Sequence, residues 1–224
     1  MPSTLTNSPR SAFTPRKEFV KDQQNAPNAF CLLAVSGQNC IRLYSFPAPI
    51  IAVFRKFFDH YKVLNGFRED VPNNFCEFSL EGKPWASPKS VATERLLVEL
   101  LSLVIQSGYT YLSTIDYGRE HDDRLAIAFS RPASSRPDSP PSDGLNSLFS
   151  GSPSRLPFAL SFPSATLLRV IAPPLDSTPA ILQAVRGAWP RGVVSEKKVG
   201  DSAYEFKLKG YSCQSKRCII FYGC

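Results

Sequence analysis

The chain has 224 residues, of which 43% are apolar and 20% charged, and its formal net charge is +7. This apolar content excludes a wholly disordered chain, and the length is enough for one large domain or two small ones with real cores. Six cysteines are far below the density of a disulfide scaffold.

The first 28 residues are rich in Ser, Thr, Pro and Arg and contain no apolar stretch of the kind found in secretory signals. They predict a disordered arm, and a transit peptide is the weaker alternative. The most apolar run, Leu96–Ile105, contains Glu99 and is too short to cross a bilayer. We therefore expect an intracellular protein, in the cytoplasm or nucleus, with reduced thiols and no transmembrane segment.

Residues 132–157 are dense in Pro, Ser and Gly. Such a stretch cannot bury enough apolar surface to offset chain entropy, so it predicts a linker. The linker divides the chain into a first unit, residues 29–131, and a second unit, residues 158–224. The second unit carries nine basic and four acidic side chains, and this mild excess would suit an acidic partner.

The two units contain similar segments at a nearly constant spacing. Ile41–Tyr44 aligns with Leu168–Ile171 at an offset of 127, and Phe75–Gly82 aligns with Ala203–Gly210 at an offset of 128. A constant offset across separate elements indicates an internal duplication.

In the first unit, Phe30–Val35 and Cys40–Tyr44 predict two extended segments around a turn. A helix entered through Pro47 and Pro49 should follow, because apolar residues then recur with helical spacing. Its stripe consists of Ile50, Val53, Phe54, Phe57, Phe58 and Tyr61. Residues 63–67 form a possible short strand.

Cys76, Phe78 and Leu80 alternate with polar residues, as in a half-buried strand. Ser87-Pro88 is expected to start a second helix that ends before Gly108. The apolar stripe of this helix comprises Leu97, Leu100, Leu101 and Val104. Two strands, 109–116 and 124–129, should follow. The order predicts an α+β fold of ferredoxin-like type, with both helices on one face of an antiparallel sheet.

The second unit repeats only the first half of this pattern. Leu167–Ile171 predicts a strand, and Ser177 or Thr178 should cap a helix whose first turn holds Pro179. A hairpin around Gly200-Asp201 should end with the strand 204–209. After Gly210 the likeness stops, and the second helix and final strands are expected to be absent.

Two hypotheses account for this incomplete unit. In the first, the chain is a truncated or mis-spliced product with an aberrant tail from residue 211. In the second, the half-unit completes its core against the first unit or against a partner. The first hypothesis is favoured here, because the tail shows no structural period.

Three segments resemble those of uncharacterised fungal proteins with a duplicated sequence. They are Leu168–Ile171 with Pro173, Ala184–Pro190, and Tyr204–Gly210. In those proteins the glycine precedes a Pro-Trp pair, a helix, a Gly-aromatic strand and a Ser-Thr-x-Asp turn. The first unit keeps these parts in Gly82–Trp85, Gly108-Tyr109 and Ser113–Asp116. The resemblance implies no activity.

Few residues suggest chemistry. His60 lies near a predicted helix end, and His121 lies among carboxylates in a predicted loop, where a solvated loop is the favoured interpretation over a cation site. Cys213, Cys218 and Cys224 are too loosely spaced for a typical zinc site. We therefore expect no catalytic, cofactor or metal site, and an enzyme is the third-ranked function.

Nucleic-acid binding, of RNA in particular, through the basic C-terminal half is the second-ranked function. The same element order occurs in RNA-recognition modules. However, Phe78 and Phe206 lie on the apolar side of their strands and should face the helices. The outward residues of the first copy are acidic, which opposes phosphate binding.

The first-ranked function is a non-catalytic protein-interaction or scaffold module with an unidentified protein partner. Partner contacts are expected at Trp85 and at a surface formed by the end of the second unit. The candidate residues there are Tyr204, Phe206, Lys207, Leu208 and Lys209.

Overall fold

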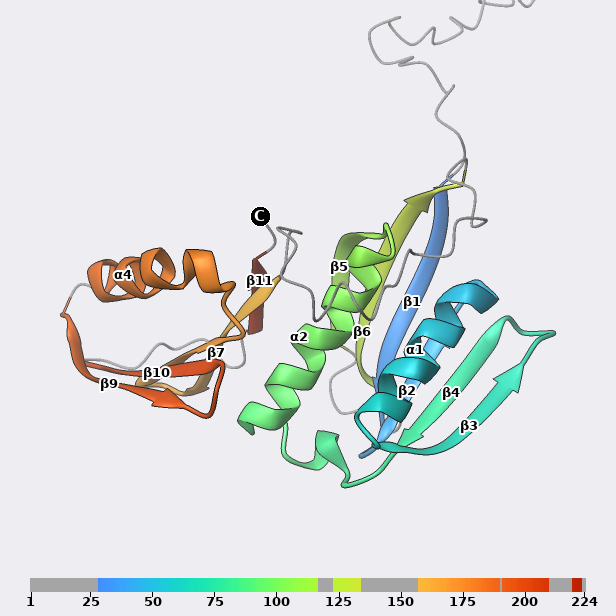
Figure 1. Cartoon of the computed structure of the whole chain (residues 1–224), viewed down its shortest axis with the longest axis horizontal. Helices are drawn as coiled ribbons and strands as arrows, with labels where there is room; N and C mark the ends of the chain where they lie inside the picture. Colours follow the sequence, from blue (N-terminus) through green and yellow to red (C-terminus); the bar gives the residue numbers. More distant parts are fainter. Residues whose placement is uncertain (1–27, 117–122, 134–156, 190, 210–218, 223–224) are drawn as a thin grey trace, which may run out of the picture.

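A computed structural model describes residues 28–116, 123–133, 157–189, 191–209 and 219–222. The expected arm and linker lie almost entirely outside these residues. Two antiparallel sheets and a few helices give a mixed α+β fold (Figure 1). No helix within the described ranges is long and apolar enough to cross a membrane.

The first sheet has six strands in the order β3-β4-β2-β1-β6-β5, with antiparallel neighbours. The strands are β1 (Asn28–Ser36), β2 (Cys40–Tyr44), β3 (Leu64–Asp70), β4 (Phe75–Leu80), β5 (Thr110–Asp116) and β6 (Asp123–Pro132). The face of this sheet that packs on helices is called its inner face here, and the opposite face its outer face.

Two helices, α1 (Ala48–His60) and α2 (Val91–Gln106), cover the inner face, and a short 3-10 turn, η2 (Pro84–Ala86), precedes α2 (Figure 1). The predicted stripe of α1 is confirmed for Ile50, Phe54, Phe57 and Phe58, which are buried in the core that contains Phe78 and Leu43. Its last member, Tyr61, lies at the C-cap and is 37% exposed. The start of α2 differs from the prediction. Ser90, not Ser87, is the N-cap, and its Oγ accepts a hydrogen bond from the backbone N–H of Thr93 at 3.1 Å.

The second sheet has five strands in the order β11-β7-β8-β10-β9. They are β7 (Phe158–Ser164), β8 (Leu167–Ile171), β9 (Val193–Val199), β10 (Ala203–Leu208) and β11 (Ile219–Tyr222). A 3-10 turn, η3 (Leu175–Ser177), leads into α4 (Thr178–Ala188). Leu182 and Val185 of α4 pack on Phe206 at the inner face of this sheet.

The order of the second sheet repeats that of the first. Strands β9, β10, β8, β7 and β11 take the places of β3, β4, β2, β1 and β6, and α4 takes the place of α1. The residue pairing agrees as well, since Leu160 pairs with Val170 as Leu33 pairs with Leu43. The predicted similarity of the two units is therefore visible in the topology.

The expectation that the second unit lacks all its final strands is wrong. Strand β11 pairs with β7 in the way that β6 pairs with β1. Residues 210–218, where a second helix was expected to be missing, lie outside the described residues. Strand β7 is an addition to the prediction, in which the first strand of the second unit is Leu167–Ile171.

The sheet order departs from a four-stranded ferredoxin-like arrangement at one strand. Strand β4 lies between β2 and β3, as in that arrangement, but β5 is separated from β2 by β1 and β6. The two extra strands form because β1 and β6 are long apolar segments that pair along nearly their whole length.

Candidate functional site at the junction of the two units

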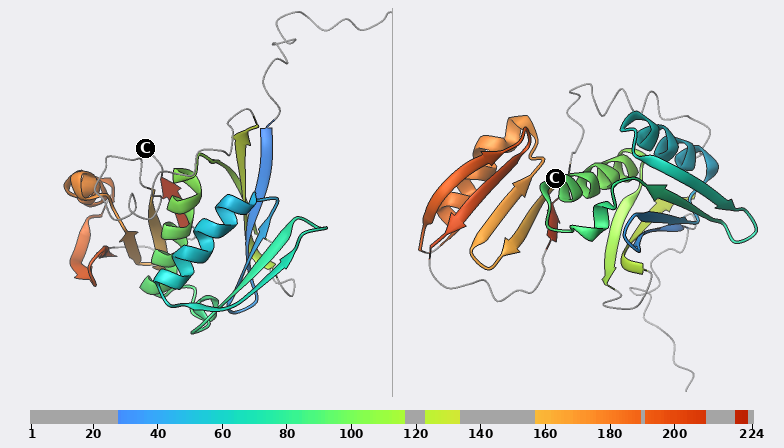
Figure 2. Two further views of the ribbon diagram at one scale, coloured as in Figure 1. Left: turned by 45° about the vertical axis from the view of Figure 1, so that its right-hand side comes forward. Right: turned by 90° about the horizontal axis from the view of Figure 1, so that it is seen from below.

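Helix α2 lies between the two sheets (Figures 1 and 2). Its predicted stripe, which includes Leu97 and Leu101, faces the first sheet and is buried there. A second stripe at four-residue spacing, formed by Glu94, Val98 and Ser102, is buried as well. One helix thus takes part in two packing interfaces.

The second stripe of α2 meets the outer face of the second sheet, opposite α4. Val98 packs against Ala159, Ile171 and Ala203 in a small apolar cluster. These residues alternate along their strands with those that contact α4, so they point away from α4. The side chains at this contact are small, which allows the helix backbone to come close to the sheet.

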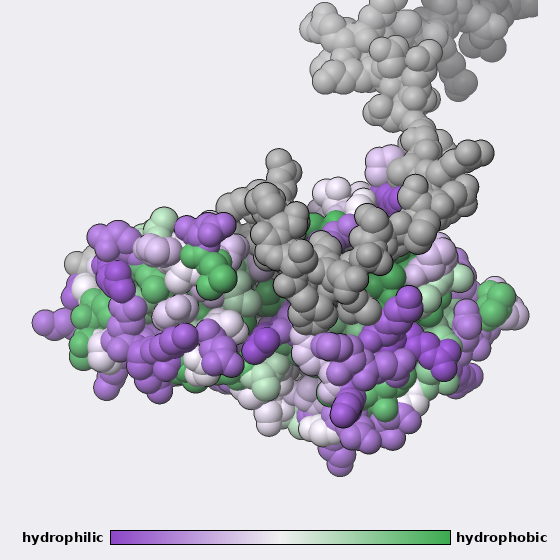
Figure 3. Space-filling model, viewed as in Figure 1, coloured by the Kyte–Doolittle hydropathy of each residue, from purple (hydrophilic) through white to green (hydrophobic). Residues whose placement is uncertain are grey.

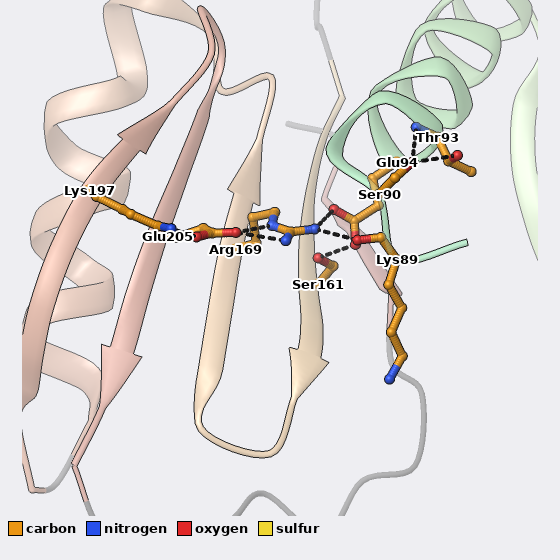
Figure 4. A network of polar contacts seen from close by, with 8 residues as sticks. All are labelled: Lys89, Ser90, Thr93, Glu94, Ser161, Arg169, Lys197 and Glu205. Atoms are coloured by element: carbon orange, nitrogen blue, oxygen red, sulfur yellow. Dashed lines mark hydrogen bonds and ion pairs between the residues drawn. The ribbon is translucent and has the colours of Figure 1, made fainter. Parts of the chain in front are cut away.

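A buried ionic network borders this cluster (Figure 4). The Arg169 guanidinium donates through Nη1 to Glu94 Oε2 at 2.7 Å and to the backbone oxygen of Lys89 at 2.9 Å. Its Nε and Nη2 donate to Glu205 Oε1 at 2.9 and 2.7 Å. Ser161 Oγ donates to Glu94 Oε1 at 2.7 Å.

Lys197 completes the network from strand β9. Its Nζ lies 2.8 Å from Glu205 Oε2. All four oxygens of the two carboxylates therefore accept a hydrogen bond or ion pair from a side chain. The two carboxylates are balanced by the buried Arg169 and by Lys197, whose side chain is 68% exposed. Such pairing is how buried ions are tolerated.

The burial is deep for charged groups. The side chains of Glu94, Arg169 and Glu205 are 3%, 9% and 7% exposed. Burial acts to lower the pKa of Arg169, but its hydrogen bonds to Glu94 and Glu205 outweigh this and hold the pKa above its ordinary value. The pKa of Glu205 is lowered, first by the ion pair with Lys197 and then by that with Arg169.

The first sheet contains the same pair. Arg42 Nε lies 2.7 Å from Glu77 Oε2, and the two residues are direct cross-strand partners, as are Arg169 and Glu205. Arg42 and Glu77 are 25% and 21% exposed. The duplicated chain therefore holds one such pair beneath a helix and one that remains partly exposed.

The residues expected to bind a partner occupy different places in the structure. Trp85 is 2% exposed, and its Nε1 donates to the backbone oxygen of Cys40. Phe206 and Leu208 are buried beneath α4, and Tyr204 packs partly against the same core. Lys207 and Lys209 are exposed. The structure does not bring Trp85 together with the other five.

Other candidates from the sequence are placed as follows. Phe78 and Phe206 face the helices, which confirms that prediction. His60 lies in the last turn of α1. His121 and the three C-terminal cysteines lie outside the described residues. Among the residues described, no three His, Cys, Asp or Glu side chains gather as metal ligands would.

Sequence reasoning missed Glu94, Ser161 and Arg169 as a set. Two signals were present. Every residue of the run Leu96–Ile105 except Glu99 and Ser102 is apolar, which is typical of a helix buried on more than one side. The aligned segments also place Arg42 opposite Arg169 and Glu77 opposite Glu205, at offsets of 127 and 128.

This network fixes one unit against the other. The ion pair between Arg169 on β8 and Glu205 on β10 binds the Glu94 carboxylate of α2. Val98 of the same helix packs on the apolar residues beside this pair. The outer face of the second sheet therefore contacts α2 through both the Glu94 carboxylate and the Val98 side chain.

Comparisons with known proteins place the chain in a family without adding an activity. No curated protein and no solved structure matches it. One family model, described only as a domain, matches residues 29–130 and 157–218, which together make up more than half of the chain. The first matched stretch contains the strands and helices of the first unit apart from the ends of β1 and β6, and the second contains β7 to β10 with α4 and ends before β11. The chain belongs to this domain family and carries the matching sequence in both of its units.

Proposed function

We propose that the chain is a non-catalytic protein-interaction or scaffold module. The observation that supports this is the docking of α2 on the outer face of the second sheet, through Glu94, Arg169 and Val98. A contact of this type uses a buried ion pair for orientation and apolar burial for free energy, as protein interfaces do.

The experiment is a reconstitution with purified components. Proteins that crosslink to the tagged full chain in its own cells would be produced separately and titrated against it by calorimetry. A saturable complex of fixed stoichiometry with at least one of them supports the proposal. If every crosslinked protein fails to bind when purified, an interaction function is contradicted.

RNA binding is less well supported. Phe78 and Phe206 of the central strands are fully buried, so these two aromatic residues are not available for base stacking. Exposed Lys198, Lys207 and Lys209 supply some positive charge. Tight oligonucleotide binding that weakens steeply with salt would favour this alternative over a protein partner.

Two narrower expectations are kept as proposals. A ferredoxin-like origin of each unit is supported by the position of β4 between β2 and β3, and of β10 between β8 and β9. A cytoplasmic or nuclear location agrees with the free thiols of Cys31, Cys40 and Cys76.

A further inference from the structure

We infer that the outer face of the second sheet, where it continues beyond α2, binds an acidic segment of a partner protein. This inference rests on the proposed interaction function and adds the surface and the chemistry of the partner. Three features of the described residues carry it: an open stretch of sheet, lysines without acidic partners, and continuity with the contact that α2 already makes.

The open stretch begins next to the polar network. The network lies at the cross-strand pair of Arg169 and Glu205, beneath α2. The next outward pair along the same two strands is Leu167 and Lys207, and Ser195 of β9 pairs with Lys207 on its other side. Lys207 and Ser195 are exposed, and Leu167 is half-buried. These last three residues are called the open row here.

Three lysines lie in or beside the open row, and all three are exposed. Lys207 belongs to the row, Lys209 follows directly after β10, and Lys89 lies just before α2, with its backbone oxygen in the polar network. In Figure 4 the ammonium end of Lys89 points away from the Glu94 carboxylate, toward the turn that joins β7 and β8. That turn leads into Leu167, so Lys89 extends toward the end of the face that holds the open row.

The positive charge of these lysines is not compensated nearby. Within the described part of the chain, the side chains of Lys89, Lys207 and Lys209 form no ion pair or hydrogen bond. The two carboxylates of the network already accept a bond or ion pair at all four oxygens. No acidic residue occurs in the described segments that contain or adjoin the lysines, which are residues 83–90, 163–167, 193–195 and 207–209. The surface therefore attracts an anionic partner.

The partner should combine carboxylates with an apolar residue. The side of the second unit seen in Figure 3 is mainly hydrophilic, and its apolar areas are small and separate, so charge has to contribute much of the binding. Leu167 supplies an apolar side chain between Lys89 and Lys207. A segment with Asp or Glu on both sides of one apolar residue can pair with the lysines while its apolar side chain contacts Leu167.

A nucleic acid fits this surface less well. A single strand gains affinity from several neutralised phosphates and from bases that stack on exposed aromatic side chains. The described segments around the open row offer only three unpaired lysines, and their single aromatic residue, Trp85, is buried. A carboxylate-bearing protein segment therefore matches the surface better.

The probe is the peptide EEELEEE with a fluorescent label, and its binding to the full chain is followed by fluorescence anisotropy. Physiological salt screens the attraction between distant charges, so the measurement reports close pairs. The neutral peptide QQQLQQQ is the control for the ligand. In a second experiment, a photoreactive analogue replaces the leucine of the acidic peptide, and the crosslinked residues of the unmodified chain are identified by mass spectrometry.

The chain offers a matched control for its own charges. The test variant carries Lys207→Glu and Lys209→Glu. The control variant carries Lys56→Glu and Lys198→Glu and has the same net charge. Lys56 is exposed on α1, and Lys198 is exposed on β9 but pairs with Tyr204, whose side chain packs at the inner face.

We expect saturable binding of EEELEEE and no binding of QQQLQQQ. The test variant should bind the acidic peptide about tenfold more weakly, because two attractive charges become repulsive, and the control variant should bind it as the unmodified chain does. Crosslinks should fall in residues 163–167 or 207–209.

Four outcomes would overturn the inference: no binding at millimolar peptide, an equal loss in both double variants, crosslinks confined to other segments, or tighter binding of a DNA oligonucleotide of the same charge through the same two lysines. The proposed function fails separately. If a purified cellular partner binds the test variant as tightly as the unmodified chain, the interaction function stands and this surface is wrong.

Discussion

Arg42 and Arg169 occupy the same position in two similar sheets, and each bonds a glutamate on the neighbouring strand. Their surroundings differ, because α2 covers Arg169 and adds Glu94 to its partners. The two arginines therefore form a natural pair for measuring what a covering helix contributes.

Replacing Arg169 by alanine should lower the free energy of unfolding much more than replacing Arg42 by alanine. Arg169→Ala leaves Glu94 and Glu205 buried without their common partner, so we expect the free energy of unfolding to fall by about 3–5 kcal/mol. Arg42→Ala breaks a partly exposed pair and should cost about 0–1 kcal/mol. Urea unfolding of the full chain measures both. Similar losses for the two variants would contradict the burial of the Arg169 network.

Acid should weaken the junction. The pKa of Glu205 is lowered in the folded chain, first through Lys197 and then through Arg169, so its carboxylate stabilises the fold above its unfolded pKa. This contribution is lost as pH falls through the folded-state value. The free energy of unfolding should therefore decrease below the ordinary range of glutamate. Glu205→Gln should be less stable at neutral pH and show a flatter acid limb in urea titrations at several pH values.

Introducing a charge at Val98 should separate the units without unfolding the first one. Val98 is 2% exposed and its side chain packs on the second sheet, whereas Leu97 and Leu101 pack on the first. In Val98→Asp we expect a larger radius of gyration by small-angle scattering, with the aromatic signals of the first core retained. Arg95→Ala, on an exposed position of the same helix, is the control. An unchanged radius would show that the units stay docked without this contact.

The buried thiols should resist modification. Burial raises the pKa of Cys31 to about 12. Burial, together with the nearby negative charge of Glu69, raises the pKa of Cys76 to about 12. Both thiols should stay unalkylated by iodoacetamide in the folded chain, as read by peptide mass spectrometry, and react after urea is added. Because these pKa values are raised, the stabilising contribution of the neutral thiols is complete below about pH 9 and is lost as pH rises toward 12. Rapid labelling at pH 8 would contradict their burial.

One substitution should stabilise the chain. Within the described part of the structure, neither polar atom of the Gln106 amide has a hydrogen-bond partner, although both atoms are buried. Gln106→Met removes two unsatisfied groups at similar volume, so the free energy of unfolding should rise by about 1 kcal/mol. Thermal unfolding is the measurement, with Ser107→Ala as a control that loses a bond to Leu103 instead. A lower melting temperature for Gln106→Met would show that the amide is hydrogen-bonded in solution.

Local pattern predicted the local elements well. The spacing of Ile50, Phe54 and Phe57 determines one face of α1, and the alternation of Cys76, Phe78 and Leu80 determines the inner side of β4. In both segments one hydrophobic period corresponds to one buried face. The element can therefore be predicted without knowing which distant residues pack on it.

The junction could not be predicted in the same way. Glu94 and Arg169 are 75 residues apart, and their contact depends on how two sheets are placed around α2. The extra apolar residues of α2, such as Val98, indicate a second buried side but do not identify the element that covers it. The sequence did not predict β11, because this strand has only four residues and its extended structure depends on pairing with β7.

Helix α2 is buried against both sheets at once, and this limits which substitutions its sequence can accept. Of its sixteen positions, only Ala92 and Arg95 are exposed, so nearly every substitution disturbs one contact or the other. In a saturation mutagenesis experiment this helix should tolerate fewer replacements than α1 or α4, each of which is half solvent-facing. Variation among relatives of the chain should accordingly be lowest in the segment that physically joins its two halves.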